Sequence, residues 1–148
     1  MRKVLFLIVA VIMAEVVTAQ KVVRNREVAS VAMGNTKLIE IEGMYSLKLR
    51  AQNSFDEYMY VDLGDSANAV RLLMFISELR ITEDDVVVLE NPSNNTIQKG
   101  PMGAFKVYDE FKVVYGYTHH TYVKKMLNAL TGKEKKKEKE GRKRNKMD

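Results

Sequence analysis

The chain has 148 residues, of which 46% are hydrophobic and only two are Pro, a balance that is typical of one globular domain and excludes a disordered protein. It contains no Cys, which excludes disulfides, thiolate metal centres and thiol nucleophiles. The formal net charge is +5, and residues 133–148 alone hold nine Lys or Arg against four Asp or Glu, so the basic charge does not predict a specific nucleic-acid-binding face.

The N-terminus has the pattern of a secretory signal peptide. Arg2 and Lys3 form a basic region, residues 4–14 are uninterruptedly apolar, and Ala19 completes a site with small side chains. The apolar run is shorter than the about 20 residues that a spanning helix needs. We therefore expect cleavage near Ala19, a secreted or periplasmic protein that is not integral to a membrane, and a linker at residues 20–27. An uncleaved anchor or a buried helix is the alternative.

Alternating apolar residues predict antiparallel strands in a single domain over residues 28–131. Gly34-Asn35 predicts a hairpin turn between the first two strands. A β-branched run at residues 86–89 predicts a central strand. The expected strands are residues 28–33, 36–42, 45–50, 57–63, 86–89, 105–108 and 111–115, the last two being one kinked strand in the alternative.

Two segments have helical periodicity. Asp65 or Ser66 can cap a helix at residues 67–79, whose solvent side carries Phe75. Thr118 can cap a second helix that runs to residue 130 and ends at Gly132. Together with the strands, this predicts an α+β fold in which an antiparallel sheet of five to six strands is covered by two helices.

A short similarity connects the two halves of the domain. Asp56-Glu57-Tyr58 and Asp109-Glu110-Phe111 each lead through an expected strand and a turn into an expected helix. This pattern indicates either a duplicated strand-turn-helix unit or a coincidence of three residues.

Residues 91–103 are rich in Asn, Ser, Gly and Pro and predict a loop that is long for a compact domain. Such loops are functional or merely mobile. Asn94-Asn95-Thr96 also fits the N-glycosylation pattern. We treat Asn94, Asn95 and Lys99 in this loop as candidate binding residues.

Aromatic side chains are the second candidate for recognition. Tyr58 and Tyr60 fall on the solvent side of their strand, and Phe75 on that of its helix. Exposed aromatic residues recognise glycans or peptides, although Tyr is also a favourable strand residue. The expected partner is an unidentified protein or glycan. Three further tyrosines could belong to such an aromatic recognition surface, namely Tyr115, Tyr117 and Tyr122.

An enzymatic alternative depends on the two histidines of the chain. His119 and His120 are adjacent, and consecutive helical residues point about 100° apart, so the pair does not predict a metal site. A hydrolase would combine one of them with Asp62, Asp65 or Asp109. No cofactor is predicted.

The C-terminal residues 132–148 are expected to form a basic disordered tail. Arg142, Lys143 and Arg144 are candidates for contact with an anionic surface such as phospholipid; a purely solubilising tail is the alternative. The sequence as a whole favours an exported non-enzymatic binding or accessory protein of the envelope or extracellular space. A small secreted hydrolase and a protein anchored electrostatically by its tail are the alternative functions.

Overall fold

The computed structural model describes residues 23–54 and 58–145, with side chains described as far as residue 132. The predicted signal peptide lies outside these residues. Among them, four strands and a helix are followed by four further strands and a helix. The elements are β1 (Asn25–Val31), η1 (Ala32–Gly34), β2 (Thr36–Ile41), β3 (Met44–Arg50), β4 (Tyr58–Gly64), α2 (Ser66–Glu78), β5 (Val86–Val88), β6 (Thr96–Lys99), η2 (Pro101–Gly103), β7 (Phe105–Tyr108), β8 (Tyr115–Thr118) and α3 (His120–Asn145).

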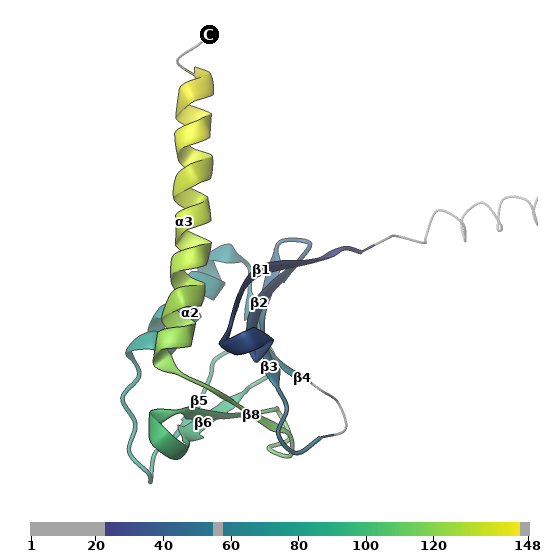
Figure 1. Ribbon diagram of the computed structural model, residues 1–148, viewed down its shortest axis with the longest axis vertical. Coiled ribbons are helices and arrows are strands. Elements are labelled where there is room, and N and C mark those ends of the chain that lie inside the picture. Colours follow the sequence, from purple (N-terminus) through teal and green to yellow (C-terminus); the bar gives the residue numbers. More distant parts are fainter. Residues whose placement is uncertain (1–22, 55–57, 146–148) are drawn as a thin grey trace, which may run out of the picture.

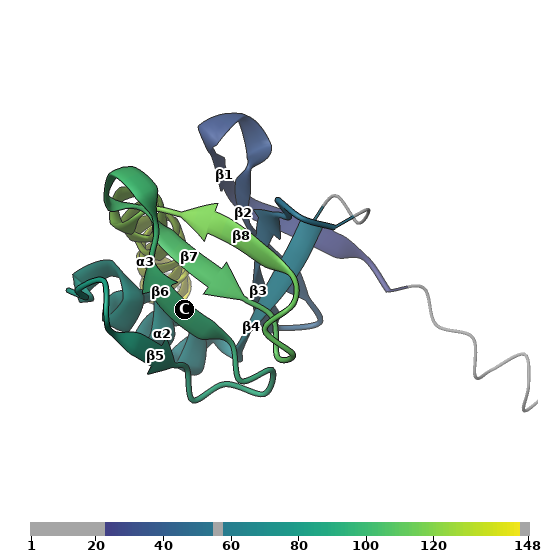
Figure 2. The ribbon, with the colours of Figure 1, turned by 90° about the horizontal axis from the view of Figure 1, so that it is seen from below.

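The strands form two antiparallel sheets. Sheet A has the order β1-β2-β3-β4, and sheet B has the order β5-β6-β7-β8 (Figures 1 and 2). The α+β class is confirmed, whereas the prediction of one sheet with five to six strands is wrong. The sheets are not continuous at β4 because the carbonyl groups of Asp62 and Tyr60 on its edge accept hydrogen bonds from the side-chain amides of Asn91 and Asn95 and not from another strand. Part of the expected linker, residues 25–27, belongs to β1.

Sheet B differs most from the sequence prediction. The expected loop at residues 91–103 contains β6, whose Ile97 is fully buried. The expected strand at residues 111–115 is instead mostly a turn, in which the Asp109 carboxylate accepts hydrogen bonds from the N–H groups of Val113 and Val114 at 2.8 and 3.0 Å. The β-branched run forms β5 at the edge of the sheet, not at its centre.

The two three-residue similarities occupy different places in the fold. Tyr58 begins β4, whereas Phe111 lies in the turn before β8. Both halves nevertheless repeat the order of four antiparallel strands and one helix. The repetition is therefore one of topology, and the matched residues do not carry it.

The last helix is longer than expected. Gly132 does not end α3, which continues to Asn145 and extends beyond the two sheets (Figure 1). A single interior Gly costs a helix only about 1 kcal/mol relative to Ala, and the Lys and Glu residues that follow are good helix formers. The expected disordered tail is thus helical as far as residue 145. Within residues 23–54 and 58–145, no helix combines the length and the apolar composition that a membrane span requires.

One hydrophobic core joins both sheets and both helices. Helices α2 and α3 pack side by side, and their apolar faces meet the inward faces of the strands (Figures 1 and 2). The sheets touch where Ala51, just after β3, forms a bridge with Gly116 of β8. A Cβ atom at Gly116 would lie 2.8 Å from the carbonyl oxygen of Arg50, so this approach requires glycine. Fully buried core residues include Leu38, Leu47, Leu49, Val61, Leu63, Leu73, Ile76, Leu89, Ile97, Val123 and Met126.

Candidate functional site: a groove between α2 and the free edge of β5

Helix α2 forms one wall of the groove. The carboxylate of Asp65 caps the helix by accepting a hydrogen bond from the N–H of Asn68 at 2.9 Å. Residues at spacings of three and four then bury one side of the helix, namely Ala69, Leu72, Leu73 and Ile76. Arg71 and Phe75 lie one turn apart beside this buried stripe and remain exposed.

Strand β5 forms the other wall, and its outer edge is free. The N–H of Leu89 donates to the carbonyl oxygen of Asn95 at 2.8 Å, and the backbone groups of an antiparallel strand alternate in direction. The groups of Val87 therefore point toward β6, and those of Val86 and Val88 point away from it. Within the part of the chain that the structure describes, no other backbone group pairs with these two valines.

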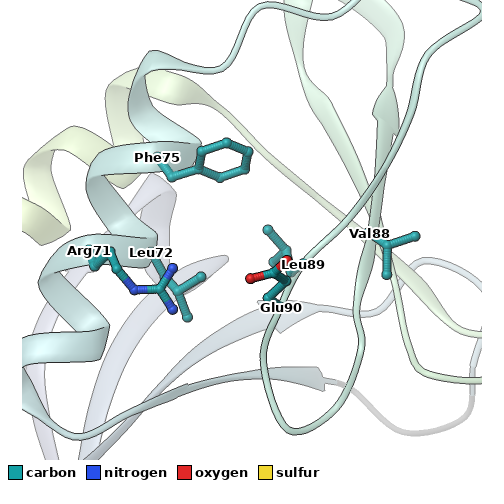
Figure 3. A pocket seen from close by; sticks show the side chains of 6 residues that line it. All are labelled: Arg71, Leu72, Phe75, Val88, Leu89 and Glu90. Carbon is teal, nitrogen blue, oxygen red and sulfur yellow. The ribbon is translucent and has the colours of Figure 1, made fainter.

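Two adjoining cavities of about 340 and about 380 Å³ lie between these walls and share Arg71, Leu72 and Glu90. We call them together the α2 groove. Figure 3 shows Phe75 and Arg71 projecting from α2 toward Leu89 and Glu90 on the opposite wall. Each volume is in the range of ligand-binding clefts. The second cavity extends the groove to Met44, Leu63, Gly64, Asp65, Asn68, Asn91 and Pro92.

The groove has an apolar floor between two opposite charges. The guanidinium of Arg71 and the carboxylate of Glu90 point toward each other above Leu72 (Figure 3). Neither belongs to an ion pair among the described residues, whose pairs are Arg26 with Glu40, Lys37 with Glu27, and Lys99 with Glu83. Both charges are therefore available to a ligand.

Buried asparagines hold the β5 wall in place. Asn91 Nδ2 donates to the carbonyl oxygen of Asp62 and to Asn95 Oδ1, both at 2.8 Å. Asn95 Nδ2 donates to the carbonyl oxygen of Tyr108 at 3.0 Å. These bonds tie the segment after β5 to β4 and β7, so the groove is preformed.

The structure places the predicted site residues at several separate positions. Phe75 lines the α2 groove, whereas Asn95 is fully buried in the hydrogen-bond network. Asn94 is an exposed turn residue with a φ of 43°. Lys99 pairs with Glu83 at 3.8 Å. The side chains of Arg142, Lys143 and Arg144 lie outside the described residues.

Tyr58 and Tyr60 do lie together, on the outward face of sheet A. Lys48 Nζ is 4.2 Å from the ring centroid of Tyr58 and 5.8 Å from that of Tyr60. A cation so close to two aromatic rings is attracted by their π faces. This cluster has an aromatic and basic character but no enclosing walls among the described cavities.

A similar cluster on sheet B was only partly foreseen. Lys106 Nζ lies 4.0 Å from the ring centroid of Tyr115 and 4.9 Å from that of Tyr108. The hydrogen bond with Tyr108 raises the pKa of the Lys106 ammonium. The rings of Tyr115 and Tyr117 meet edge to face at 5.6 Å. Sequence alone named Tyr115 and Tyr117, but the register that pairs Tyr108 with Tyr115 depends on the fold.

The histidines do not meet the candidate carboxylates. His119 Nδ1 is 2.9 Å from the hydroxyl of Thr121. Asp62 accepts hydrogen bonds from Ser46 and Ser93, while Asp65 caps α2 and Asp109 closes its turn. In the part of the chain that the structure describes, no cluster of three or more acidic or histidine side chains could hold a metal ion.

No protein family, curated protein or solved structure matches this chain. The functional argument therefore depends on the geometry of the groove.

Proposed function

We propose that this protein is an exported, non-enzymatic binding protein that takes an extended peptide segment of a partner protein into the α2 groove. The observation that carries the proposal is the free backbone edge of β5 opposite the apolar side of α2. The N-terminal sequence pattern supports the export part of the proposal.

An extended peptide suits both walls of the groove. Its backbone can pair with the outward groups of Val86 and Val88, which adds a strand to sheet B. Every second side chain then points to the same face, so an apolar residue can rest on Leu72 and Phe75. Arg71 and Glu90 offer one charge of each sign and can fix the register of the peptide.

The edge of β4 is already occupied. Its outward carbonyl groups, those of Tyr60 and Asp62, accept hydrogen bonds from the side-chain amides of Asn95 and Asn91. These contacts protect β4 from pairing with another chain.

The remaining two edges are also less suitable. The N–H of Gln52 donates to the carbonyl oxygen of Tyr115 at 2.9 Å, which covers part of the edge of β8. Charged Arg26 and Glu27 lie on β1, and charged side chains discourage strand addition. β5 carries only valines, and Val86 and Val88 are 54% and 56% exposed.

Selection of random linear peptides on the purified protein, followed by affinity measurement, tests the proposal. Phe75→Ala removes an apolar contact of the groove and should weaken a selected peptide by about tenfold, which equals about 1.4 kcal/mol. Met74→Ala is the matched control, because Met74 is exposed to the same degree on the same helix, 46% against 47%, but does not line the groove. Equal losses in the two variants would contradict the proposed site.

Two further measurements make the test specific. Val88→Pro deletes an outward N–H without breaking the bonds to β6, so it should block the peptide while leaving the fold intact. In NMR spectra, the peptide should shift the amide signals of Val86 and Val88 first. Shifts confined to other surfaces would overturn the proposal.

The export part of the proposal has its own test. N-terminal sequencing of the exported protein should begin at Gln20, and an intact Met1 would contradict the predicted cleavage.

A further inference from the structure

A second, independent cavity lies where the two sheets meet near the start of α3. It has a volume of about 380 Å³, is open to solvent, and is bordered by the β1–β2 hairpin, the end of β3, η2 and the β8–α3 junction. We call it the turn pocket. We infer that it binds an amphipathic organic anion, meaning a ring or chain of apolar carbon that carries one anionic group.

The polar groups of the turn pocket favour an anion. Arg50 lines the pocket with a residue of fixed positive charge, and none of the described residues that line it is Asp or Glu. Arg50 belongs to no ion pair in the part of the chain that the structure describes. His119 adds a further hydrogen-bonding group. The hydroxyls of Thr36 and Thr118 are buried and lie 3.4 Å from each other, so they pair with one another behind the pocket wall. Arginine binds carboxylate, sulfonate and phosphate groups through paired N–H donors.

The remaining walls of the pocket favour an apolar body on the same ligand. Six of the eight residues that form them are Tyr117, Tyr122, Pro101, Met102, Ala32 and Ala104, and the other two are the amides Asn35 and Gln52. Aromatic rings and a flexible thioether pack well against rings of varied shape. A small hydrated ion such as chloride would leave these surfaces uncovered, so the ligand must present both a charge and carbon.

The η2 wall is held in a fixed conformation. The N–H of Gly100 donates to the carbonyl oxygen of Ala104 at 2.8 Å. The N–H of Ala104 in turn donates to the carbonyl oxygen of Pro101 at 3.0 Å. A Cβ atom at Gly100 would lie 3.3 Å from the Tyr117 ring, which shows how closely this turn packs on β8. A wall of this kind needs little reorganisation when a ligand enters.

The test compares two fluorescent probes with similar carbon skeletons. One is 1-anilinonaphthalene-8-sulfonate, and the other is the uncharged N-phenyl-1-naphthylamine. The purified protein should bind the sulfonate about tenfold more tightly, because only the sulfonate can pair with Arg50. Equal affinities would overturn the inference.

Variants locate the effect. Arg50→Gln should abolish the preference for the sulfonate, Arg50→Lys should keep part of it, and Tyr122→Ala should weaken both probes. Arg80→Gln is the matched control, because Arg80 is exposed and lines none of the described cavities. An equal effect of Arg50→Gln and Arg80→Gln would refute the site. Probe-induced NMR shifts should centre on Tyr117 and His119, and shifts centred on Phe75 would instead assign the probe to the α2 groove. Because the peptide test uses different variants, either proposal can fail without the other.

Discussion

Replacement of Asn95 should destabilise the protein through hydrogen bonds that join the two sheets. Its Nδ2 atom lies 3.0 Å from the carbonyl oxygen of Tyr108 in β7 and 3.5 Å from that of Tyr60 in β4. Its Oδ1 atom accepts from Asn91 Nδ2 at 2.8 Å. Asn95→Ala removes all three contacts from a site with no exposure to solvent.

The expected loss follows from those contacts. A hydrogen bond contributes about 1 kcal/mol, and a buried group left unpaired costs about 1–3 kcal/mol. Asn91 keeps its second acceptor, the carbonyl oxygen of Asp62, and the bond to Tyr60 is long. We therefore expect Asn95→Ala to lower the free energy of unfolding by about 2–3 kcal/mol, which is roughly 30- to 150-fold in the unfolding equilibrium. Asn95→Asp should lower it further, because a buried carboxylate would face two carbonyl oxygens.

Urea denaturation followed by far-ultraviolet circular dichroism measures these changes, since the chain has no Trp for fluorescence. Asn94→Gly is the control: Asn94 is exposed, and its φ of 43° suits glycine, so the change should stay within about 0.5 kcal/mol. A loss as small as this for Asn95→Ala would refute the reasoning. So would a milder effect of Asn95→Asp than of Asn95→Ala, because the loss would then come from the missing volume and not from the polar contacts.

Three further predictions use other positions. Gly116→Ala should cost about 1–3 kcal/mol, because the new Cβ would lie 2.8 Å from the backbone oxygen of Arg50; an unchanged thermal midpoint would contradict this. Gly132→Ala should raise stability by about 0.5–1 kcal/mol, because the new methyl group meets nothing within 4 Å in the interior of α3; a loss in the same melting experiment would mean that Gly132 ends the helix. The carboxyl of Asp85 should titrate by NMR below its ordinary pKa of 3.8, because the Thr82 N–H donates to it at 2.7 Å and the Thr82 hydroxyl at 3.0 Å. Since the folded pKa is the lower one, these contacts stabilise the fold above pH 3.8 and stop doing so as the pH falls through the folded pKa. Thr82→Val deletes the hydroxyl bond and should move the midpoint back toward 3.8, and an unmoved midpoint would exclude that contribution.

Local periodicity predicted sheet A and α2 well. The strand expected at residues 36–42 is β2 (Thr36–Ile41), and the helix expected at residues 67–79 is α2 (Ser66–Glu78). In both cases one side of the element faces the core, so the spacing of apolar residues directly reports burial. Phe75 was correctly placed on the exposed side of its helix.

Sheet B was predicted poorly because distant contacts determine it. Asn91 and Asn95 look like loop residues, yet they are buried because β4 and β7 supply hydrogen-bond partners. Local composition cannot reveal partners that lie so far along the chain. The valine run of β5 likewise has the pattern of a buried strand, but whether a strand is central or at an edge depends on which strands pair with it.

Because distant contacts also build the α2 groove, the sequence predicted only part of it. Phe75 was named as a candidate binding residue, whereas Arg71 was not. The opposite wall depends on the pairing of β5 with β6 alone and on the turn at residues 89–95. The signal that the sequence offered is a short β-branched run that follows an amphipathic helix.

The repeated topology explains why a groove forms between α2 and β5. Helix α3 packs against β1, the first strand of the other half, whereas α2 faces the end of β5 across a cavity. β1 has seven residues, and its Val28, Ala29 and Val31 pack against the core that contains α3. β5 has only three residues, and two of its valines face outward. The first strand of the second half is therefore too short to close against its helix, and the space that it leaves is the α2 groove, bounded by an unpaired strand edge to which another strand can be added.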